Sequence, residues 1–278
     1  MTTTIGAVDT DRLLKAKHRA MWALGNYPEL ATDLISGLGP ALVNACKVRR
    51  GDRVLDVAAG SGNAAIPAAL IGASVVASDL TPELFESGRS QAAARGAELE
   101  WVSADAESMP FPDSDFDIVM SCVGVMFAPH HQSAADELIR VCRTGGTIGL
   151  LSWTPGGFVG QLFATMTPYA PPPPPGAQPP PLWGSEDHVR ELLGDRVTDI
   201  AARTGTVTID HFSAPADFRE YFKSHYGPTI AVFRAIAGDP ERVADLDRDL
   251  DALVTRVQRA PGTAVMDWEY LLLTCTKV

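Results

Sequence analysis

Short apolar runs alternate along the chain with segments whose apolar residues recur at helical spacing. Uninterrupted short runs are typical of strands buried on both faces. They occur at 53–58, 74–79, 99–103, 117–123 and 145–153. Helical spacing occurs at 64–71, from Thr81 onward and at 132–142, and Thr81-Pro82 is typical of a helix start. The alternation predicts an α/β protein with an open parallel sheet and helices on both faces.

The segments on either side of this core have other patterns. Apolar residues from Asp11 to Ala45 recur at helical spacing, with breaks at Tyr27-Pro28 and 37–40, which predicts two or three cap helices. Nine of the fourteen residues at 168–181 are proline, which predicts a connector or a flap. Beyond it we expect a helix at 186–193, a strand at 204–212, helices within 215–260 and a final strand at 265–277. The two strands would complete the sheet as an antiparallel edge pair.

Composition narrows the class of protein. A chain of 278 residues, 46% hydrophobic and 21% charged, fits one large globular domain or a core with a small lid. The net charge of -11 disfavours nucleic acid and anionic membranes as partners. The sequence shows neither a basic leader nor 18 consecutive apolar residues, so we expect a cytoplasmic protein without membrane insertion. Scattered cysteines predict buried free thiols: Cys46, Cys122, Cys142 and Cys275.

A glycine turn follows the first predicted strand. Gly60 and Gly62 allow a sharp reversal, and Asn63 is the expected N-cap of the next helix. The sequence from Gly60 to Ala65 also fits the glycine motif of a dinucleotide-binding site, in which Asp79 would bind the ribose. Asp56, inside the strand, would repel a pyrophosphate and attract a cationic ligand without phosphate. S-adenosylmethionine (SAM) is such a ligand, since it carries an ammonium and a sulfonium. A carboxylate that only binds loop amides is the alternative for Asp56.

The core from about Gly51 to Trp153 resembles the class I SAM-dependent methyltransferases, and within them the UbiE-like or methyltransferase-11 type. The resemblance rests on segments that occur in the expected order: 54–62, 76–80, 104–111, 116–121 and 138–147. Thr144 departs from the pattern, because proline usually precedes Gly145-Gly146. We expect the turn to survive, since the glycines supply its dihedral angles.

The resemblance implies SAM as the cofactor, S-adenosylhomocysteine as the product, and a set of contact residues. Asp56 and the glycine turn would face the methionine end of SAM, and Asp79 would accept hydrogen bonds from both ribose hydroxyls. Leu80 would pack on the adenine, Asp105 and Ala106 would bind its amino edge, and Ser121 would lie beside the methionine. We also expect Trp22 or Tyr27 to cover the sulfonium, although plain packing of the cap is the alternative. The full predicted cofactor set is Tyr27, Asp56, Ala59, Gly60, Ser61, Gly62, Asp79, Leu80, Asp105, Ala106 and Ser121.

The resemblance also implies the architecture. We expect a Rossmann-like three-layer α/β/α methyltransferase fold with a mostly parallel seven-stranded sheet, an antiparallel C-terminal strand and a helical cap or lid. The expected boundaries are a cap at 1–45, a SAM-binding core at 46–155, a Pro-rich loop and acceptor lid at 156–240, and a last helix and strand at 241–278.

The expected function is methyl transfer from SAM to a small, hydrophobic or aromatic acceptor by in-line displacement. Positioning alone can contribute about 7–11 kcal/mol, so a dedicated base need not exist. Candidate bases are His130, His131, His225 and Tyr226, each of which has a purely structural alternative. The spacing of His, Cys, Asp and Glu predicts no metal site. An NAD-dependent oxidoreductase, a catalytically inactive SAM-binding regulatory protein and a homodimer remain open.

Overall fold

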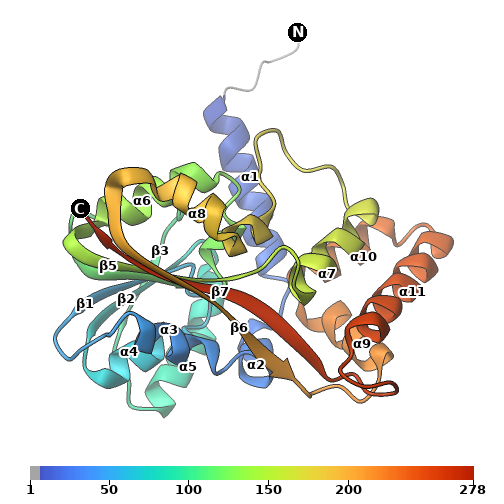
Figure 1. Ribbon diagram of the computed structural model, residues 1–278. Coiled ribbons are helices and arrows are strands. Elements are labelled where there is room, and N and C mark those ends of the chain that lie inside the picture. The colour runs from blue at the N-terminus through green and yellow to red at the C-terminus, as the bar shows by residue number, and fades with distance from the viewer. Residues whose placement is uncertain (1–6) are drawn as a thin grey trace, which may run out of the picture.

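A seven-stranded sheet forms the centre of the computed structural model, which describes residues 7–278 (Figure 1). The strand order is β3-β2-β1-β4-β5-β7-β6. The bounds are β1 Arg53–Val57, β2 Ser74–Asp79, β3 Glu100–Ser103, β4 Phe116–Cys122, β5 Cys142–Trp153, β6 Val197–Ile209 and β7 Met266–Lys277. The first five strands pair in parallel, and β7 is antiparallel to both β5 and β6. The expected sheet and its antiparallel edge pair are confirmed.

Helices cover both faces of this sheet. In Figure 1, α6 (His131–Val141) and α8 (Glu186–Leu193) lie above it, and the helices below it are α3 (Leu38–Ala45), α4 (Ala65–Ile71) and α5 (Phe85–Ala94). Contacts of α6 with β4 and β5, and of α4 with β1 and β2, close the two outer layers. The result is the three-layer Rossmann-like fold predicted from the sequence.

The central strands are buried on both faces. Val54 and Leu55 of β1 and Val119 and Met120 of β4 are inaccessible to solvent, although they point to opposite faces in turn. This explains why their sequences are continuously apolar rather than alternating. Each large side chain buried in this way contributes about 1.5–3 kcal/mol to folding. The loops that follow β1 and β4 therefore extend from two strands that are anchored in the core.

A cap beside the sheet combines the two ends of the chain. The C-terminal part supplies α9 (Pro215–His225), α10 (Gly227–Ile236) and α11 (Pro240–Val257), which pack with α7 (Phe158–Met166). The N-terminal part supplies α1 (Ala7–Trp22), which contacts α10, and α2 (Tyr27–Leu34), which contacts α9. In Figure 1 the Pro-rich segment is an arc between α7 and α8, and the Gln178 N–H fixes it to Pro129 O at 2.9 Å. Short 3-10 turns occupy both of its ends.

Some local expectations are wrong. Helix α7 was not predicted, because the glycines at 156, 157 and 160 favour a loop in the sequence. In the structure Phe158, Leu162 and Met166 lie on one buried face of this helix. Strand β6 begins at Val197 rather than Thr204, and β5 already begins at Cys142. Asn63 does not cap α4: the N-cap is Ala64, and the Asn63 side-chain amide donates to Ile35 O at 3.2 Å. Prolines at the first turns of α2 and α3 begin these helices, as proline's fixed φ allows.

The cysteines are free thiols, as expected; Cys122 is partly buried and the other three are buried. Among the residues described, no helix combines the length and the apolarity needed to cross a membrane.

Candidate active site

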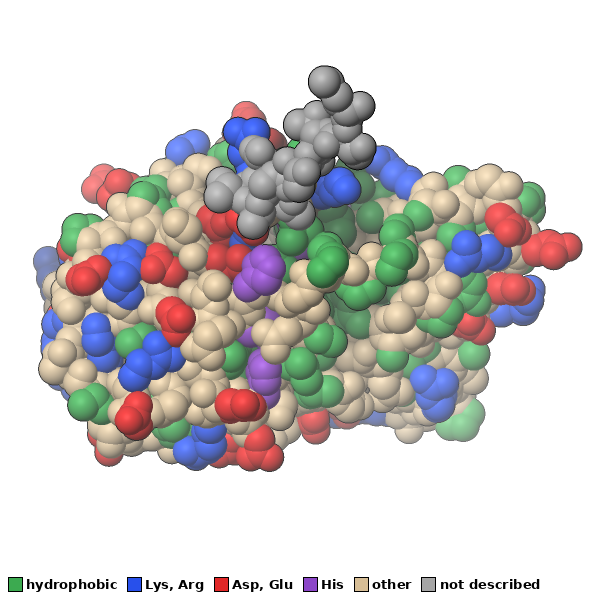
Figure 2. Space-filling model, turned by 90° about the horizontal axis from the view of Figure 1, so that it is seen from above, with side chains coloured by type: hydrophobic (Ala, Val, Ile, Leu, Met, Phe, Trp, Pro, Cys, Tyr) green, Lys and Arg blue, Asp and Glu red, His purple; other side chains and the backbone are tan. Residues whose placement is uncertain are grey.

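A deep pocket opens where the parallel strands end. It is lined by residues that directly follow β1, β2, β3 and β4, and by parts of α1, α2 and α9. Ligands bind at this end of open α/β sheets because the strand-to-helix loops gather there. The space between its walls, including the open mouth, is about 1270 Å³. Figure 2 shows hydrophobic side chains gathered around a hollow on this face, next to histidines.

One wall of the pocket, here called the polar side, consists of Ala59, Gly60, Ser61, Asp79, Leu80, Asp105 and Ala106. Gly60 adopts a left-handed φ of 56°, and nothing but Leu84 would approach a side chain there, at 3.9 Å. The backbone of the turn therefore borders open space. Gly62 has a different role: a Cβ would meet Trp101 at 2.9 Å, so this glycine allows tight packing behind the turn.

Asp79 shapes the polar side. Its Oδ2 accepts the Gly60 N–H at 2.8 Å, and its Oδ1 accepts the Thr81 N–H at 2.7 Å. The carboxylate thus links the glycine turn to the end of β2. Burial raises the pKa of Asp79, and the two amide donors oppose that shift. Each carboxylate oxygen retains a second lone pair, so the pair can accept hydroxyl groups of a ligand as well.

Asp56 lies behind the turn and is fully buried in β1. Neither of its oxygens has a hydrogen bond of normal geometry among the described residues, and the nearest favourable group is the Ala65 N–H. Burial raises its pKa to about 8, which the Ala65 amide only partly offsets. The alternative in which Asp56 only accepts hydrogen bonds from loop amides would rest on the Ala65 N–H alone among the described residues. A buried carboxyl without partners is costly and needs a functional explanation.

Helix α1 closes the mouth over the polar side through charged contacts. Lys15 Nζ lies 3.1 Å from Asp105 Oδ1 and 2.5 Å from Glu107 Oε2. Asp105 Oδ1 also accepts the Glu107 N–H at 3.0 Å, while its Oδ2 has no partner in the described chain. His18 of α1 lines the pocket too, and burial followed by the Lys15 charge lowers its pKa. One helix thus supplies a cation to the loop after β3 and a neutral imidazole to the pocket.

The opposite wall, here called the aromatic side, is a row of rings in mutual contact. In order along the row they are Phe127, Trp22, Tyr27, Tyr226, Phe222, Trp268 and Trp153. Neighbouring ring centroids are 4.6 to 6.3 Å apart, the range of favourable aromatic pairs. Gly227 permits this arrangement, since a Cβ there would lie 2.7 Å from the Tyr27 hydroxyl, which accepts the Gly227 N–H at 3.0 Å.

Two strained turns meet between the two sides. Ala58 after β1 and Val123 after β4 have φ values of 55° and 47°, and both line the pocket. A β-branched residue in this region is a genuine outlier, and such strain costs about 1–3 kcal/mol. Gly124 allows the turns to touch, because a Cβ would lie 2.2 Å from Ala58 O. Ser121 fixes the same junction: its Oγ donates to Val57 O at 2.6 Å and accepts the Val125 N–H at 2.8 Å.

The structure brings most of the predicted cofactor residues together. Eight line the pocket: Tyr27, Ala59, Gly60, Ser61, Asp79, Leu80, Asp105 and Ala106. Asp56, Gly62 and Ser121 lie behind its wall. Asp56 is a buried carboxyl without a hydrogen bond of normal geometry among the described residues, and the other two hold the turns in place. Direct ligand contact by these three remains a prediction without geometric support.

Among the four candidate bases, only Tyr226 lines the pocket. His131 is fully buried, with Nδ1 2.9 Å from His188 Nε2, and its pKa is lowered to about 4 by burial and then by His188. His225 stacks on Tyr221 at 4.0 Å and pairs with Glu29 at 3.3 Å. The buried position of His131 differs from the solvent-facing or capping alternative.

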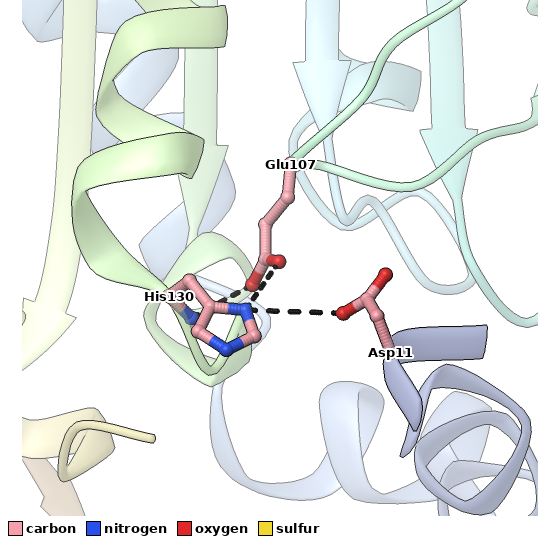
Figure 3. Close-up of side chains that lie close together, drawn as sticks. All are labelled: Asp11, Glu107 and His130. Carbon is pink, nitrogen blue, oxygen red and sulfur yellow. Dashed lines mark hydrogen bonds and ion pairs between the residues drawn. The ribbon is translucent and has the colours of Figure 1, made fainter. Parts of the chain in front are cut away.

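His130 lies at the pocket mouth in a cluster with Asp11 and Glu107, shown in Figure 3. Its Nδ1 is 2.8 Å from Glu107 Oε2 and 4.0 Å from Asp11 Oδ1. The fold thus gathers a group able to hold a metal ion, although the sequence spacing predicts none. Glu107 Oε2 is already paired with the Lys15 ammonium, so the chain itself supplies a cation there. The absence of a metal cofactor remains a prediction.

Comparison with known proteins assigns the family. A family model for a methyltransferase domain matches residues 54–146. An uncharacterised Mycobacterium tuberculosis protein is 54% identical over 260 residues, 94% of each chain. The ubiquinone/menaquinone biosynthesis C-methyltransferase UbiE of Pseudomonas putida is 33% identical over 165 residues, 55% of this chain and 64% of that enzyme. The YcgJ protein of Bacillus subtilis has a TM-score of 0.58 at 18% identity, over 87% of this chain and 98% of that one. The chain belongs to the class I SAM-dependent methyltransferases.

The pocket of this methyltransferase fits the family's cofactor better than a dinucleotide. Near the glycine turn the described lining residues include the carboxylate of Asp79, with Asp56 behind it, and Lys15 is the only Lys or Arg in the lining. Lys15 is committed to Asp105 and Glu107. A pyrophosphate would lie beside the Asp79 carboxylate without a basic partner, whereas a cationic ligand would be attracted.

Sequence reasoning missed much of the methyltransferase pocket. Its unpredicted lining includes Lys15, His18, Cys122, Val123, Phe127, Trp153, Phe222 and Trp268. No local motif marks the aromatic members, because they come from separate helices and strands that meet only in the folded chain. The spacing of Lys15, His18 and Trp22 on one helix was the available clue, since residues three and four apart share a face.

Proposed function

We propose that the protein transfers a methyl group from SAM to a small, hydrophobic or aromatic acceptor and releases S-adenosylhomocysteine. The observation that carries this proposal is the pocket itself, in which a polar side and an aromatic side face one cavity of about 1270 Å³. The two sides offer chemically different surfaces, one for a cofactor and one for a second molecule. A site for the cofactor alone would not require a row of seven rings.

The polar side would hold the cofactor. Asp79 would accept the two ribose hydroxyls, and the free Oδ2 of Asp105 and the Ala106 backbone would bind the adenine amino edge. Leu80 and Leu84 would cover the adenine faces. The buried carboxyl of Asp56 would favour a positively charged ligand near the glycine turn. Tyr27, at the junction of the two sides, would cover the ligand's cationic centre.

The aromatic side would hold the acceptor and align it. SAM supplies an electrophilic methyl group: the carbon–sulfur bond breaks with its electron pair on sulfur, and a pair from the acceptor forms the new bond. The chain's task is then to orient the acceptor and exclude water, which accounts for about 7–11 kcal/mol in well-oriented systems. Burial raises the pKa of the titratable residues there, Tyr27, Cys122 and Tyr226, so none is a base at neutral pH.

The distant relative UbiE supports this class of acceptor, since it is a C-methyltransferase of ubiquinone and menaquinone biosynthesis. A flat, unsaturated acceptor would stack on the rings of the aromatic side.

Calorimetry with SAM and S-adenosylhomocysteine tests the cofactor half of the proposal. We expect binding of one ligand per chain, and no binding at high micromolar concentration would contradict it. A methyl-transfer assay across phenols, quinols, amines and fatty acids then tests catalysis. Transfer to a flat acceptor is expected, whereas SAM binding without turnover on any class would favour a regulatory protein. Enhanced NADH fluorescence on titration would instead favour an oxidoreductase.

A further inference from the structure

The aromatic side contains one hydroxyl group without a partner. Tyr226, at the end of α9, lines the pocket and is 7% exposed. Its ring is held by Trp22, Tyr27, Phe163 and Phe222. Within the described chain its hydroxyl makes no hydrogen bond, whereas the neighbouring Tyr27 hydroxyl is engaged by the Gly227 N–H. This oxygen is not among the fully buried polar atoms that lack partners, so it reaches the open space of the pocket, where a ligand atom can accept its hydrogen bond.

Tyr226 also lies next to the place where the two sides meet. The ring centroids of Tyr226 and Tyr27 lie 6.3 Å apart, and both residues line the same pocket as Asp79. This is the part of the aromatic side that borders the cofactor.

The charge balance around Tyr226 points to the form of the acceptor. The charged lining residues of the pocket are Lys15, Asp79 and Asp105, all on or beside the polar side. Among the described lining residues, the aromatic side has no carboxylate that could balance the positive charge of a cofactor facing it. A phenol whose pKa is raised by burial keeps its proton and donates it in a hydrogen bond. A hydroxyl donor that faces a pocket with a cationic ligand is an arrangement that suits an oxygen anion.

We propose that the Tyr226 hydroxyl donates a hydrogen bond to the oxygen of an acceptor that binds as an oxyanion, namely the phenolate or enolate form of a flat molecule. This inference rests on the proposed methyltransferase function and specifies its acceptor. The acceptor has already released its proton to solvent when it binds, so the aromatic side needs no general base. Tyr226 acts on the acceptor oxygen, whereas Asp79 and Asp105 act on the cofactor.

The probe for the test is 4-nitrophenol, whose phenol and phenolate forms differ in colour. It is titrated with pH in the presence of protein saturated with sinefungin, an amine analogue of SAM that transfers no methyl group. The variants are Tyr226→Phe, which removes only the hydroxyl, and Tyr221→Phe as a matched control. Tyr221 lies on the same helix but does not line the pocket, and its hydroxyl donates to Asp33 at 2.9 Å.

We expect the bound probe to ionise at a pH about one to two units lower in the wild type and in Tyr221→Phe than in Tyr226→Phe, the shift expected for a hydrogen bond to a charged group. At a pH where the probe is fully ionised, the wild type should bind it at least tenfold more tightly than 4-nitroanisole, and Tyr226→Phe should bind both alike. Equal ionisation in all variants, or no binding of the probe, would overturn the inference. If the wild-type protein does not bind sinefungin, the result contradicts the proposed function instead.

Discussion

The two sides of the pocket are built in different ways. The polar side comes from loops that follow adjacent parallel strands, within residues 56 to 106, and its carboxylates are fixed by backbone amides. The aromatic side comes from residues between Trp22 and Trp268, and ring-to-ring packing holds it together. The first side is local in sequence and hydrogen-bonded, and the second is assembled from distant segments. This difference fits the proposal that the polar side holds the cofactor and the aromatic side the acceptor.

The largest expected effect concerns Asp56. A buried carboxyl with a pKa of about 8 instead of 3.8 binds its proton more tightly in the folded state. As pH rises from 4, the unfolded chain releases this proton first, so stability falls until folded Asp56 ionises near pH 8. Asp56→Asn removes this effect. We expect the variant to gain a few kcal/mol over the wild type between pH 5 and pH 8, at most ~1.4 kcal/mol per pH unit.

Urea unfolding at both pH values measures this gain, and a difference between variants that is independent of pH would refute the assignment. Above pH 8, where folded Asp56 is ionised, the same variant should bind SAM more weakly while its affinity for adenosine changes less, since only SAM carries the cationic groups. Equal losses for both ligands would show that Asp56 does not act through its charge.

The next effect separates the two sides directly. Asp79→Ala removes the acceptor of the Gly60 and Thr81 amides and the predicted ribose ligand. We expect SAM affinity to fall ten- to a hundredfold, corresponding to about 1.5–3 kcal/mol for hydrogen bonds to a charged group. Phe222→Leu on the aromatic side is the matched comparison and should leave SAM affinity within about twofold. Calorimetry measures both affinities, and an equal loss of SAM affinity in the two variants would contradict the distinction between the sides.

A smaller effect concerns the closure of the polar side by α1. Lys15→Met removes the cation that pairs with Asp105 and Glu107. The helix should then separate more readily from the loop after β3, and we expect SAM to dissociate roughly three- to tenfold faster, a change of about 0.7–1.4 kcal/mol. Stopped-flow displacement by excess S-adenosylhomocysteine measures the rate. Lys17→Met, on the exposed face of the same helix, is the control. An equal increase of the dissociation rate in both variants would contradict a role of the Lys15 contacts in holding α1 over the polar side.

The smallest effect concerns the junction of the two sides. Tyr27→Phe loses the hydrogen bond from the Gly227 N–H and leaves that amide without an acceptor. We expect a loss of about 1 kcal/mol in unfolding free energy, with the row of rings intact. Thermal unfolding monitors the loss, and an unchanged midpoint would mean that packing alone holds α2 against α10.

The sequence was sufficient for the sheet because its strands are local apolar runs. The seven strands and the antiparallel C-terminal strand followed from the resemblance, while α7 escaped notice because glycines at 156, 157 and 160 favour a loop. Boundaries failed where one element runs into the next, as at Cys142, where α6 passes directly into β5.

The candidate site was predictable to the extent that it is local. Asp79 and Asp105 follow strands, and such residues must gather at one edge of a parallel sheet. Ser121 carried the right motif position, yet its hydroxyl is used between Val57 and Val125. The histidines at 130, 131 and 225 were chosen by residue type, and tertiary packing decided their surroundings. Trp22, Tyr27 and Tyr226 of the aromatic side were candidates from the sequence, but the row of rings could not be predicted, since contacts between distant segments leave no pattern in the sequence.

A crystal structure of the complex with S-adenosylhomocysteine tests the division of the pocket most directly. We predict that the ribose hydroxyls lie on Asp79, the adenine lies beside Asp105, and the sulfur faces the rings of Tyr27 and Tyr226. A ligand that lies along the aromatic side, or whose sulfur points away from these rings, would contradict the account.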